Sequence, residues 1–272
     1  MGERLEGGNM NAVERENDTV LRVAGPWTSS VHALLAHLHA ADIHGIPRPL
    51  GIEARSGGER ERLSFIEGIV PQYPLPAWVW DEDVLTSGAR LLRRIHDASA
   101  SFPSDSRTWQ QPSREPAEVI CHNDFAPHNL VFDTDHALVG VIDWDMCSPG
   151  PRIRDLAYFA TRTVPLTAEP PADAPQGNDV RPRIQTIIDS YGCDAEVNDV
   201  LAYAADGLRE LALYSHEAAE RLARPELREH AAMYQRDAAA IERGEVGGFE
   251  RKSPPDPQGQ GSTRATAARA GH

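Results

Sequence analysis

Four polar residues in the middle of the chain have the types and spacing to bind a metal ion and orient a hydroxyl group: His122, Asp124, Asn129 and Asp143. Two carboxylates and an amide suit Mg²⁺, a hard cation that takes oxygen ligands and keeps sites for water and substrate phosphates. A His-x-Asp pair alone would say little, but this ordered set with strand-length runs between its members is specific. We predict that Asp124, Asn129 and Asp143 converge on one point.

Short apolar runs separate these residues and must position them. Each run has the length of a β-strand, and the polar stretch 133–136 between the last two has turn chemistry. The runs are 119–121, 130–132 and 137–142. A small hairpin with polar groups at both ends of its strands is therefore predicted. In the alternative, these Asp and Asn side chains only cap turns and end a strand, and the match of four positions is an accident.

His122-x-Asp124 followed by Asn129 matches the catalytic loop of kinases, and Asp143 lies one hairpin later, where kinases place a metal-binding aspartate. Three segments resemble the aminoglycoside phosphotransferase and choline kinase-like enzymes. They are CHNDFAPHNLVFD, similar to the catalytic loop, VGVIDWD, similar to the metal-binding strand end, and PGPRIRDLAYFA, similar to the stretch that follows. The resemblance is tight over residues 119–160, looser over 5–100, and beyond 160 it rests on helical character alone.

The resemblance implies an α+β, bilobal, protein-kinase-like fold. Residues 1–68 would form a small N-lobe with an antiparallel sheet and one helix, which covers the nucleotide. Residues 69–246 would form a larger, mostly helical C-lobe with the catalytic loop, the metal site and the acceptor pocket. The end of the chain is rich in Gly, Pro, Ser, Gln and Arg, so residues 247–272 are predicted to be a disordered tail.

Hydrophobic periodicity predicts the elements that must hold the site. Strands are expected at 12–15, 19–23 and 63–68. Helices are expected at 28–41, 81–102, 179–191, 195–223 and 225–243, and the stretch 154–160 should begin another. Thr28 or Ser29 should cap the first helix. Several prolines make 165–178 irregular, as a surface loop rather than a substrate flap.

The resemblance also assigns roles at the site. It implies ATP, with GTP possible, and Mg²⁺ as cofactors. Asp124 would accept or orient the proton of the acceptor hydroxyl. Asn129 and Asp143 would bind the nucleotide through the Mg²⁺ that they hold.

Four further residues around the loop receive supporting roles or none. Asp145 would assist the metal site without binding the ion, and His122 would brace the loop. Asp155 would tie the C-lobe to the catalytic loop, as it usually does in the resembled enzymes. His128 is given no chemistry.

Lysine is nearly absent, which bears on phosphate binding. Kinases place a lysine on the third strand, yet the only lysine here is Lys252 in the predicted tail. Arg22, in the strand 19–23, is the best candidate for the role, and its planar fork favours two-pronged contacts. Otherwise phosphate binding relies on Mg²⁺ and backbone. The glutamate that usually pairs with this lysine is also missing, because His32 or Val31 stands at its helical position.

The nucleotide base would be bound by backbone groups. The resemblance implies that residues from Ser64 to Ile66 offer these groups to the adenine. The polar loop 7–11 would cover the phosphates, although it is not a GxGxxG sequence.

Charge and composition restrict the partners. The net charge of −14 and the pI of about 5.2 argue against nucleic acid, whose phosphates require a basic surface. They fit a cationic, hydroxyl-bearing small molecule, although acidity also simply favours solubility. Acidic residues along one helical face would bind its cationic groups or form a solvated face: Asp199, Asp206, Glu210 and Glu217.

No run approaches the ~18 apolar residues of a membrane span, and the acidic start is not a signal peptide. Three cysteines without metal spacing fit the reducing cytoplasm. Together with the resemblance, these features predict an ATP-dependent O-phosphotransferase that confers resistance to an aminoglycoside or a cationic cyclic peptide. The alternatives are a kinase of choline or homoserine and a non-catalytic immunity protein that sequesters a toxin. The sequence leaves the acceptor hydroxyl, ATP or GTP, and the oligomeric state open.

Overall fold

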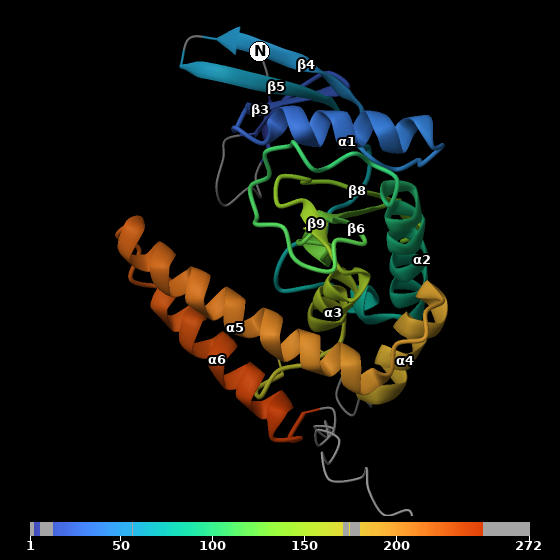
Figure 1. Cartoon of the computed structure of the whole chain (residues 1–272), viewed down its shortest axis with the longest axis vertical. Coiled ribbons are helices and arrows are strands. Elements are labelled where there is room, and N and C mark those ends of the chain that lie inside the picture. The colour runs from blue at the N-terminus through green and yellow to red at the C-terminus, as the bar shows by residue number, and fades with distance from the viewer. Residues whose placement is uncertain (1–2, 6–12, 56, 171–173, 175–179, 247–272) are drawn as a thin grey trace, which may run out of the picture.

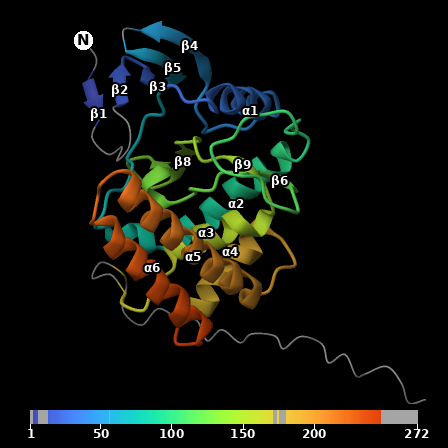
Figure 2. The ribbon, with the colours of Figure 1, turned by 60° about the vertical axis from the view of Figure 1, so that its left-hand side comes forward.

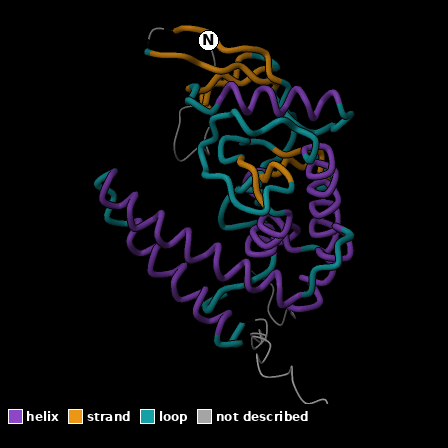
Figure 3. Tube along the Cα trace, viewed as in Figure 1, coloured by secondary structure: helices purple, strands orange, loops and turns teal. Residues whose placement is uncertain are grey.

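The computed structural model describes residues 3–5, 13–55, 57–170, 174 and 180–246. A small sheet and one helix lie at one end of the molecule, and the remaining helices gather below them (Figure 1). The tube in Figure 3 shows the same division, with most strands in the upper part. The predicted α+β, kinase-like architecture is confirmed.

The first part is an antiparallel sheet of five strands with the order β1-β2-β3-β5-β4. The strands are β1 (Glu3–Leu5), β2 (Val13–Glu16), β3 (Thr19–Val23), β4 (Pro49–Arg55) and β5 (Gly58–Ser64). Helix α1 (Thr28–Ala40) packs against the sheet with its apolar side, which includes Leu34 and Leu38. Thr28 is the first helical residue rather than the cap, and its Oγ accepts a hydrogen bond from the Gly25 N–H at 2.9 Å.

The second part carries the predicted loop and hairpin between helices. Its helices are α2 (Glu82–Ser99), α3 (Arg152–Thr163), α4 (Val180–Tyr191), α5 (Val197–Arg221) and α6 (Leu227–Glu242), with short turns η1 (Ala77–Trp80) and η2 (Pro127–Asn129). Its strands are β6 (Val119–Cys121), β7 (Leu130–Phe132), β8 (Leu138–Val141) and β9 (Ser148–Gly150). Helices α5 and α6 run side by side along one flank (Figure 2).

Among the elements beside the catalytic loop, strand β9 is one that the sequence analysis missed. The stretch from Ser148 to Gly150 pairs antiparallel with β6, where Pro149 lies opposite Ile120. Proline lacks an N–H and is found in short or edge strands, so the Pro-Gly sequence gave no strand signal. The pairing ties the start of α3 to the strand that leads into the catalytic loop.

Two glycines allow the two parts to approach closely. Gly45 has a φ of +77°, and a Cβ there would lie 2.4 Å from the Val139 carbonyl oxygen in β8. Gly68 has a φ of +152°, and its Cβ would lie 2.5 Å from the carbonyl oxygen of Phe132. Only glycine fits both the backbone conformation and the space. The β7–β8 hairpin is thereby held directly beneath the sheet.

The boundary between residues 68 and 69 stays a prediction, and the loop 7–11 and the tail 247–272 lie outside the described residues. Among the described helices, none has the length and hydropathy that a membrane crossing requires.

Candidate active site

The loop between β6 and β7 presents Asp124 at its surface. The amide Nδ2 of Asn129, at the end of η2, donates to the Asp124 backbone oxygen at 2.9 Å and to Oδ2 at 2.8 Å. One side chain therefore fixes both the backbone and the carboxylate of Asp124. The two residues are brought together as predicted.

The other carboxylate oxygen of Asp124 has two neighbours. The Tyr158 hydroxyl in α3 donates to Oδ1 at 2.5 Å, and His128 Nε2 lies 3.5 Å from the same atom. Burial by itself raises the pKa of Asp124, but the contacts with His128 and Tyr158 outweigh it, so the pKa lies below its ordinary value. Asp124 is ionised at neutral pH and can accept a hydrogen bond from a hydroxyl group.

Tyr158 was not predicted as a site residue. It follows Asp155 by three positions on α3, so the two side chains share a helix face that points to the loop. The spacing of three residues from Asp155 could have indicated this role. A tyrosine on the apolar face of a helix is, however, usually interpreted as a core residue.

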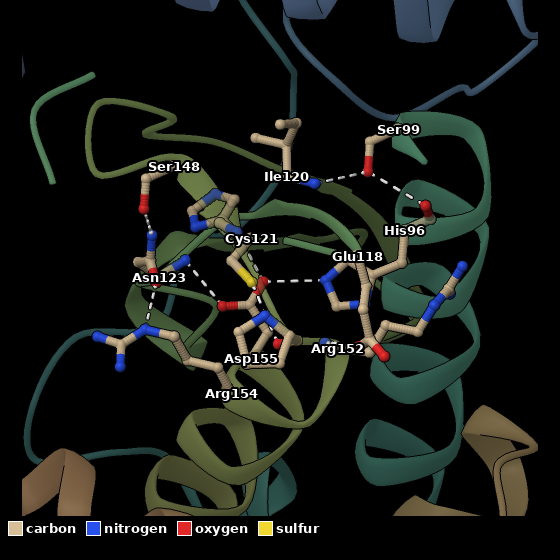
Figure 4. A network of polar contacts seen from close by, with 12 residues as sticks. His96, Ser99, Glu118, Ile120, Cys121, Asn123, Ser148, Arg152, Arg154 and Asp155 are labelled. Atoms are coloured by element: carbon tan, nitrogen blue, oxygen red, sulfur yellow. Dashed lines mark hydrogen bonds and ion pairs between the residues drawn. The ribbon is translucent and has the colours of Figure 1, made fainter. Parts of the chain in front are cut away.

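Asp155 holds the loop from below (Figure 4). It is fully buried and accepts hydrogen bonds from the backbone N–H of His122 at 2.6 Å, the N–H of Asn123 at 2.8 Å and His96 Nε2 at 3.1 Å. Burial opposes ionisation, but the bonds from His96 and the loop outweigh it and hold the pKa of Asp155 below its ordinary value. The structure thus joins Asp155 to the catalytic loop, as the resemblance implied.

Two residues of the site have left-handed backbone conformations. Asn123 has a φ of 62° and Asp143 a φ of 59°, which is uncommon outside glycine and persists only when the surroundings enforce it. The Asn123 side chain donates to Met146 O and Ser148 Oγ at 2.8 and 2.9 Å, and its Oδ1 accepts from Arg154 Nε at 2.7 Å. The loop is therefore a rigid element, although the sequence analysis assigned Asn123 no role.

His122 braces the loop from the inside. It is fully buried, and its Nε2 lies 3.1 Å from the carbonyl oxygen of Ile142, the residue before Asp143. Burial lowers the pKa of His122, so the imidazole is neutral and carries no proton for catalysis. The Ile142 N–H also donates to the Asn129 backbone oxygen at 2.9 Å. These two bonds place the start of the Asp143-Trp144-Asp145 turn beside the loop.

Arg22 joins this turn to the sheet. Its Nη1 lies 2.8 Å from Asp143 Oδ1, its Nη2 lies 2.7 Å from Asp145 Oδ1, and its Nε lies 2.6 Å from Glu61 Oε1. Within the described chain, the Asp143 side chain has no hydrogen bond to Asp124 or Asn129. The predicted convergence is thus direct for Asp124 and Asn129, whereas the Asp143 carboxylate turns toward Arg22.

Glu61 supplies the acidic partner that the sequence analysis could not find on the helix. It lies on β5, directly opposite Arg22 on β3, and its side chain is 1% exposed. His32 of α1, which occupies the expected helical position, lies 2.8 Å from Glu61 Oε2 through its Nε2. An arginine–glutamate ion pair is therefore present, although the sequence analysis found no glutamate on the helix. Its carboxylate comes from the neighbouring strand β5.

Replacement of Glu61 by glutamine is expected to lower the free energy of unfolding by about 1.5–3 kcal/mol, because Arg22 loses a charged hydrogen bond in a buried place. Urea denaturation measures the change. Glu59→Gln, on the exposed side of the same strand, should change little. Adding His32→Glu to the Glu61 variant returns a carboxylate to the helix and should recover part of the loss. A Glu61 variant as stable as the wild type would contradict the assignment.

The donor set around Arg22 suits a divalent cation. Three carboxylates, those of Glu61, Asp143 and Asp145, face one guanidinium, which leaves an excess of negative charge. Burial and the neighbouring carboxylates raise the pKa of Asp145 to about 6, although Arg22 opposes the shift. The Asp143 side chain is 47% exposed and so accessible to an ion. Oxygen donors with unbalanced negative charge are the environment that Mg²⁺ prefers.

Two of the three backbone N–H groups from Ser64 to Ile66, which were predicted to be offered to the adenine, are already used inside the protein. Ser64 donates its N–H to the Arg48 carbonyl oxygen at 2.9 Å, and Phe65 donates its N–H to Asp18 O at 2.8 Å. These two groups are therefore engaged in the sheet. Within the described residues, no hydrogen bond occupies the N–H of Ile66, which leaves it as the candidate of that stretch.

The acidic face predicted for α5 is largely committed to structure. Glu210 pairs with Arg114 at 2.7 Å and with Arg154 at 2.9 Å. Asp199 accepts a hydrogen bond from the Glu196 N–H at the start of the helix. Of the four residues, Asp206 and Glu217 alone have no side-chain hydrogen bond or ion pair within the described chain, which weakens the expectation of a cation-binding face.

Comparisons with known proteins agree with this geometry. Residues 104–186, which include the catalytic loop and α3, match the family described as "Phosphotransferase enzyme family". This segment is similar to phosphotransferases and the fold is kinase-like, so the predicted resemblance to aminoglycoside phosphotransferase and choline kinase-like enzymes is confirmed.

Two solved structures show the likeness over most of the chain. A choline/ethanolamine kinase family protein from Mesorhizobium loti has a TM-score of 0.62 and 17% identity, and the match covers 89% of this chain and 87% of that one. An amicoumacin kinase in complex with AMP-PNP, Ca²⁺ and Ami has a TM-score of 0.64 and 12% identity, and the match covers 92% of this chain and 90% of that one. At these identities the likeness concerns the fold.

A curated relative is closer in sequence. The trifolitoxin immunity protein of Rhizobium leguminosarum bv. trifolii is 38% identical over 150 residues. The match covers 53% of this chain and 55% of the relative, so about half the length of each protein is compared.

Proposed function

We propose that the chain is an ATP-dependent O-phosphotransferase that phosphorylates a hydroxyl group of a small molecule. The observation that carries the proposal is the carboxylate of Asp124, which Asn129 and Tyr158 hold on a rigid loop beside the turn that bears Asp143. The match of this segment to phosphotransferases supports it. A protein that only bound its ligand would not need this constellation.

The residues would divide the work as follows. Asp124 orients the acceptor hydroxyl, whose oxygen forms a bond to the γ-phosphorus of ATP while the bond to the ADP oxygen breaks. The hydroxyl proton passes to Asp124 and then to solvent. Positioning contributes more than basicity, because the transition state of phosphoryl transfer is loose. Tyr158 holds Asp124 in place, and Arg22 contacts the phosphates from the sheet.

Asn129 and Asp143 would hold Mg²⁺, with Asp145 in support. When bound, the ion neutralises charge that develops on the phosphate oxygens. If the Asp143 carboxylate separates from Arg22, the carboxylate becomes available to the ion and the guanidinium becomes available to the phosphates. Bound AMP-PNP and Ca²⁺ in the amicoumacin kinase support a nucleotide with a divalent ion. The backbone of Ile66 is the proposed contact for the base, and ATP or GTP would fit a contact made by backbone alone.

For the acceptor, we propose a hydroxyl-bearing antibiotic or toxin with cationic groups, whose phosphorylation confers resistance. The net charge of −14 favours attraction of cations, and the amicoumacin kinase was solved with an antibiotic. The immunity protein from Rhizobium supports self-protection as the biological role.

The same relative favours a second candidate, an immunity protein that sequesters a toxin without modifying it. The absence of the strand lysine and of the helix glutamate favours such a non-catalytic protein. The buried Arg22–Glu61 pair weakens that argument, since the chain has an equivalent ion pair in another position.

The test is incubation of the purified chain with ATP, Mg²⁺ and a panel of hydroxyl-bearing antibiotics, with mass spectrometry for the gain of one phosphoryl group. Chelation of the metal should abolish the gain. Asp143→Asn should raise the Mg²⁺ concentration needed for half-maximal transfer at least about tenfold, because the ion loses a charged ligand. Asp135→Asn, in the exposed hairpin turn, should leave the requirement unchanged. An Asp143 variant with the wild-type requirement would remove Asp143 from the metal site.

A further inference from the structure

Arg162 lies one turn after Tyr158 on α3, among aromatic side chains. Its guanidinium carbon lies 4.9 Å from the centre of the Tyr158 ring and 5.8 Å from the centre of the Tyr234 ring on α6. Such contacts are favourable for a cation, and a hydrogen bond to Tyr234 uses part of the guanidinium edge, but no carboxylate among the described residues does so.

No carboxylate compensates this charge. Among the described residues, none forms an ion pair with Arg162, and its Nε is buried without a hydrogen-bond partner. Arg22, by contrast, has three carboxylates around it. Buried guanidinium groups are normally paired, because their removal from water is costly. Arg162 has only tyrosines as described partners and a buried Nε without any, which indicates that a ligand supplies the missing carboxylate.

The position relative to Asp124 identifies the ligand as the acceptor. Tyr158 contacts Arg162 with its ring and donates its hydroxyl to Asp124. His128 also lies beside Asp124, and the Tyr73 ring lies 6.0 Å from the His128 ring. Three tyrosines, from the connector before η1 and from α3 and α6, thus lie near Arg162 or beside the neighbour of Asp124: Tyr73, Tyr158 and Tyr234.

We propose that the acceptor carries a carboxylate group, which Arg162 binds while the acceptor hydroxyl is presented to Asp124. This inference rests on the proposed function and narrows its substrate class to zwitterionic compounds, such as short peptides or amino-acid derivatives with a hydroxyl group. A guanidinium binds a carboxylate through two parallel hydrogen bonds. A phosphate group fits less well, since the aromatic surroundings offer only a single positive charge.

The experiment compares hydroxyl compounds in matched pairs, as free acids and as carboxamides. The probes are homoserine and serine- or threonine-containing tripeptides, with kanamycin as a cationic acceptor without a carboxylate. Binding is measured by calorimetry with Mg²⁺ and a non-hydrolysable ATP analogue, and transfer by mass spectrometry with ATP. The wild type should bind the free acids at least roughly tenfold more tightly than the amides.

Arg162→Gln should abolish this preference while amide binding stays within about twofold. Arg162→Lys should keep part of it, since the charge remains and the fork is lost. Arg94→Gln, an exposed arginine on α2, should keep all of it. If Arg162→Gln does not fold, the comparison of free acids with amides on the wild type still tests whether the acceptor site binds a carboxylate.

Equal binding of acids and amides by the wild type, failure of every free acid to bind, or a preference that survives in Arg162→Gln would each overturn the inference. Transfer to kanamycin and the amides without preference for the acids would overturn it and leave the proposed function intact. Binding of the free acids without transfer from ATP would overturn the proposed function and support the carboxylate site.

Discussion

Replacement of Asp124 by alanine is expected to reduce phosphoryl transfer at least about a hundredfold, because the acceptor hydroxyl loses the group that orients it and receives its proton. Binding of the nucleotide should change little, since Arg22 and Asp143 are left in place. Single-turnover transfer, measured by mass spectrometry, gives the rate, and calorimetry with an ATP analogue gives the affinity.

Asp105→Ala, in the exposed loop after α2, is the matched control and should retain full activity. Tyr158→Phe provides an intermediate case, because the carboxylate stays but loses its shortest hydrogen bond. Its transfer rate should fall between those of the wild type and Asp124→Ala. Wild-type transfer by Asp124→Ala would end the assignment.

Asp124→Ala also distinguishes phosphorylation from sequestration in cells. If protection against a toxin depends on phosphorylation, Asp124→Ala should lose it although the protein still folds and binds. If the chain sequesters the toxin, protection should persist in the variant. Protein abundance, measured in the same cells, shows whether a loss of protection is a loss of the protein.

Replacement of Asp155 by alanine is expected to lower the free energy of unfolding by about 3–5 kcal/mol. The change leaves His96 and the N–H groups of His122 and Asn123 without their acceptor in a fully buried place. Urea denaturation measures the loss, and Asp206→Ala, on the exposed side of α5, should show no measurable change. Transfer activity should fall as well, because the loop that carries Asp124 is released.

The pH dependence of stability provides a second test of Asp155. Its pKa in the folded protein is below the ordinary value of 3.8, so the unfolded state binds the proton more readily. The stabilisation by Asp155 is therefore fully present above pH 3.8 and is lost as the pH falls below that value. Asp155→Asn should show a flatter acid limb than the wild type in urea titrations. Equal slopes for the two proteins would contradict an ionised Asp155 in the folded state.

Much of the fold could be predicted from local patterns. The strands beside the catalytic loop and the last three helices lie within a few residues of their predicted places, because short apolar runs and helical periodicity are local signals. Strand β9 was missed, since the Pro-Gly sequence disfavours strands and only its pairing with β6 makes it one. Helix α1 begins at Thr28 as predicted, but the cap position is taken by Trp27 rather than by Thr28 or Ser29.

Parts of the site could not be predicted for the same reason. Glu61 is 39 residues from Arg22 and becomes its partner only through the pairing of β3 with β5. Tyr158 reaches Asp124, and Arg162 lacks a carboxylate, because of how α3 and α6 pack beside the loop. The expected acidic, cation-binding face of α5 is weakened by arginines from two distant segments, which pair with Glu210.

The residue types that could form the site are readable from the sequence, because His122, Asp124, Asn129 and Asp143 lie at short spacings in one continuous stretch. The near absence of lysine made Arg22 the candidate for the position that kinases fill with lysine. The folded arrangement was needed to show which carboxylate pairs with Arg22, which hydroxyl holds Asp124, and that Arg162 has no ion pair among the described residues. Contacts between distant segments depend on how strands pair and helices pack, and no local pattern encodes them.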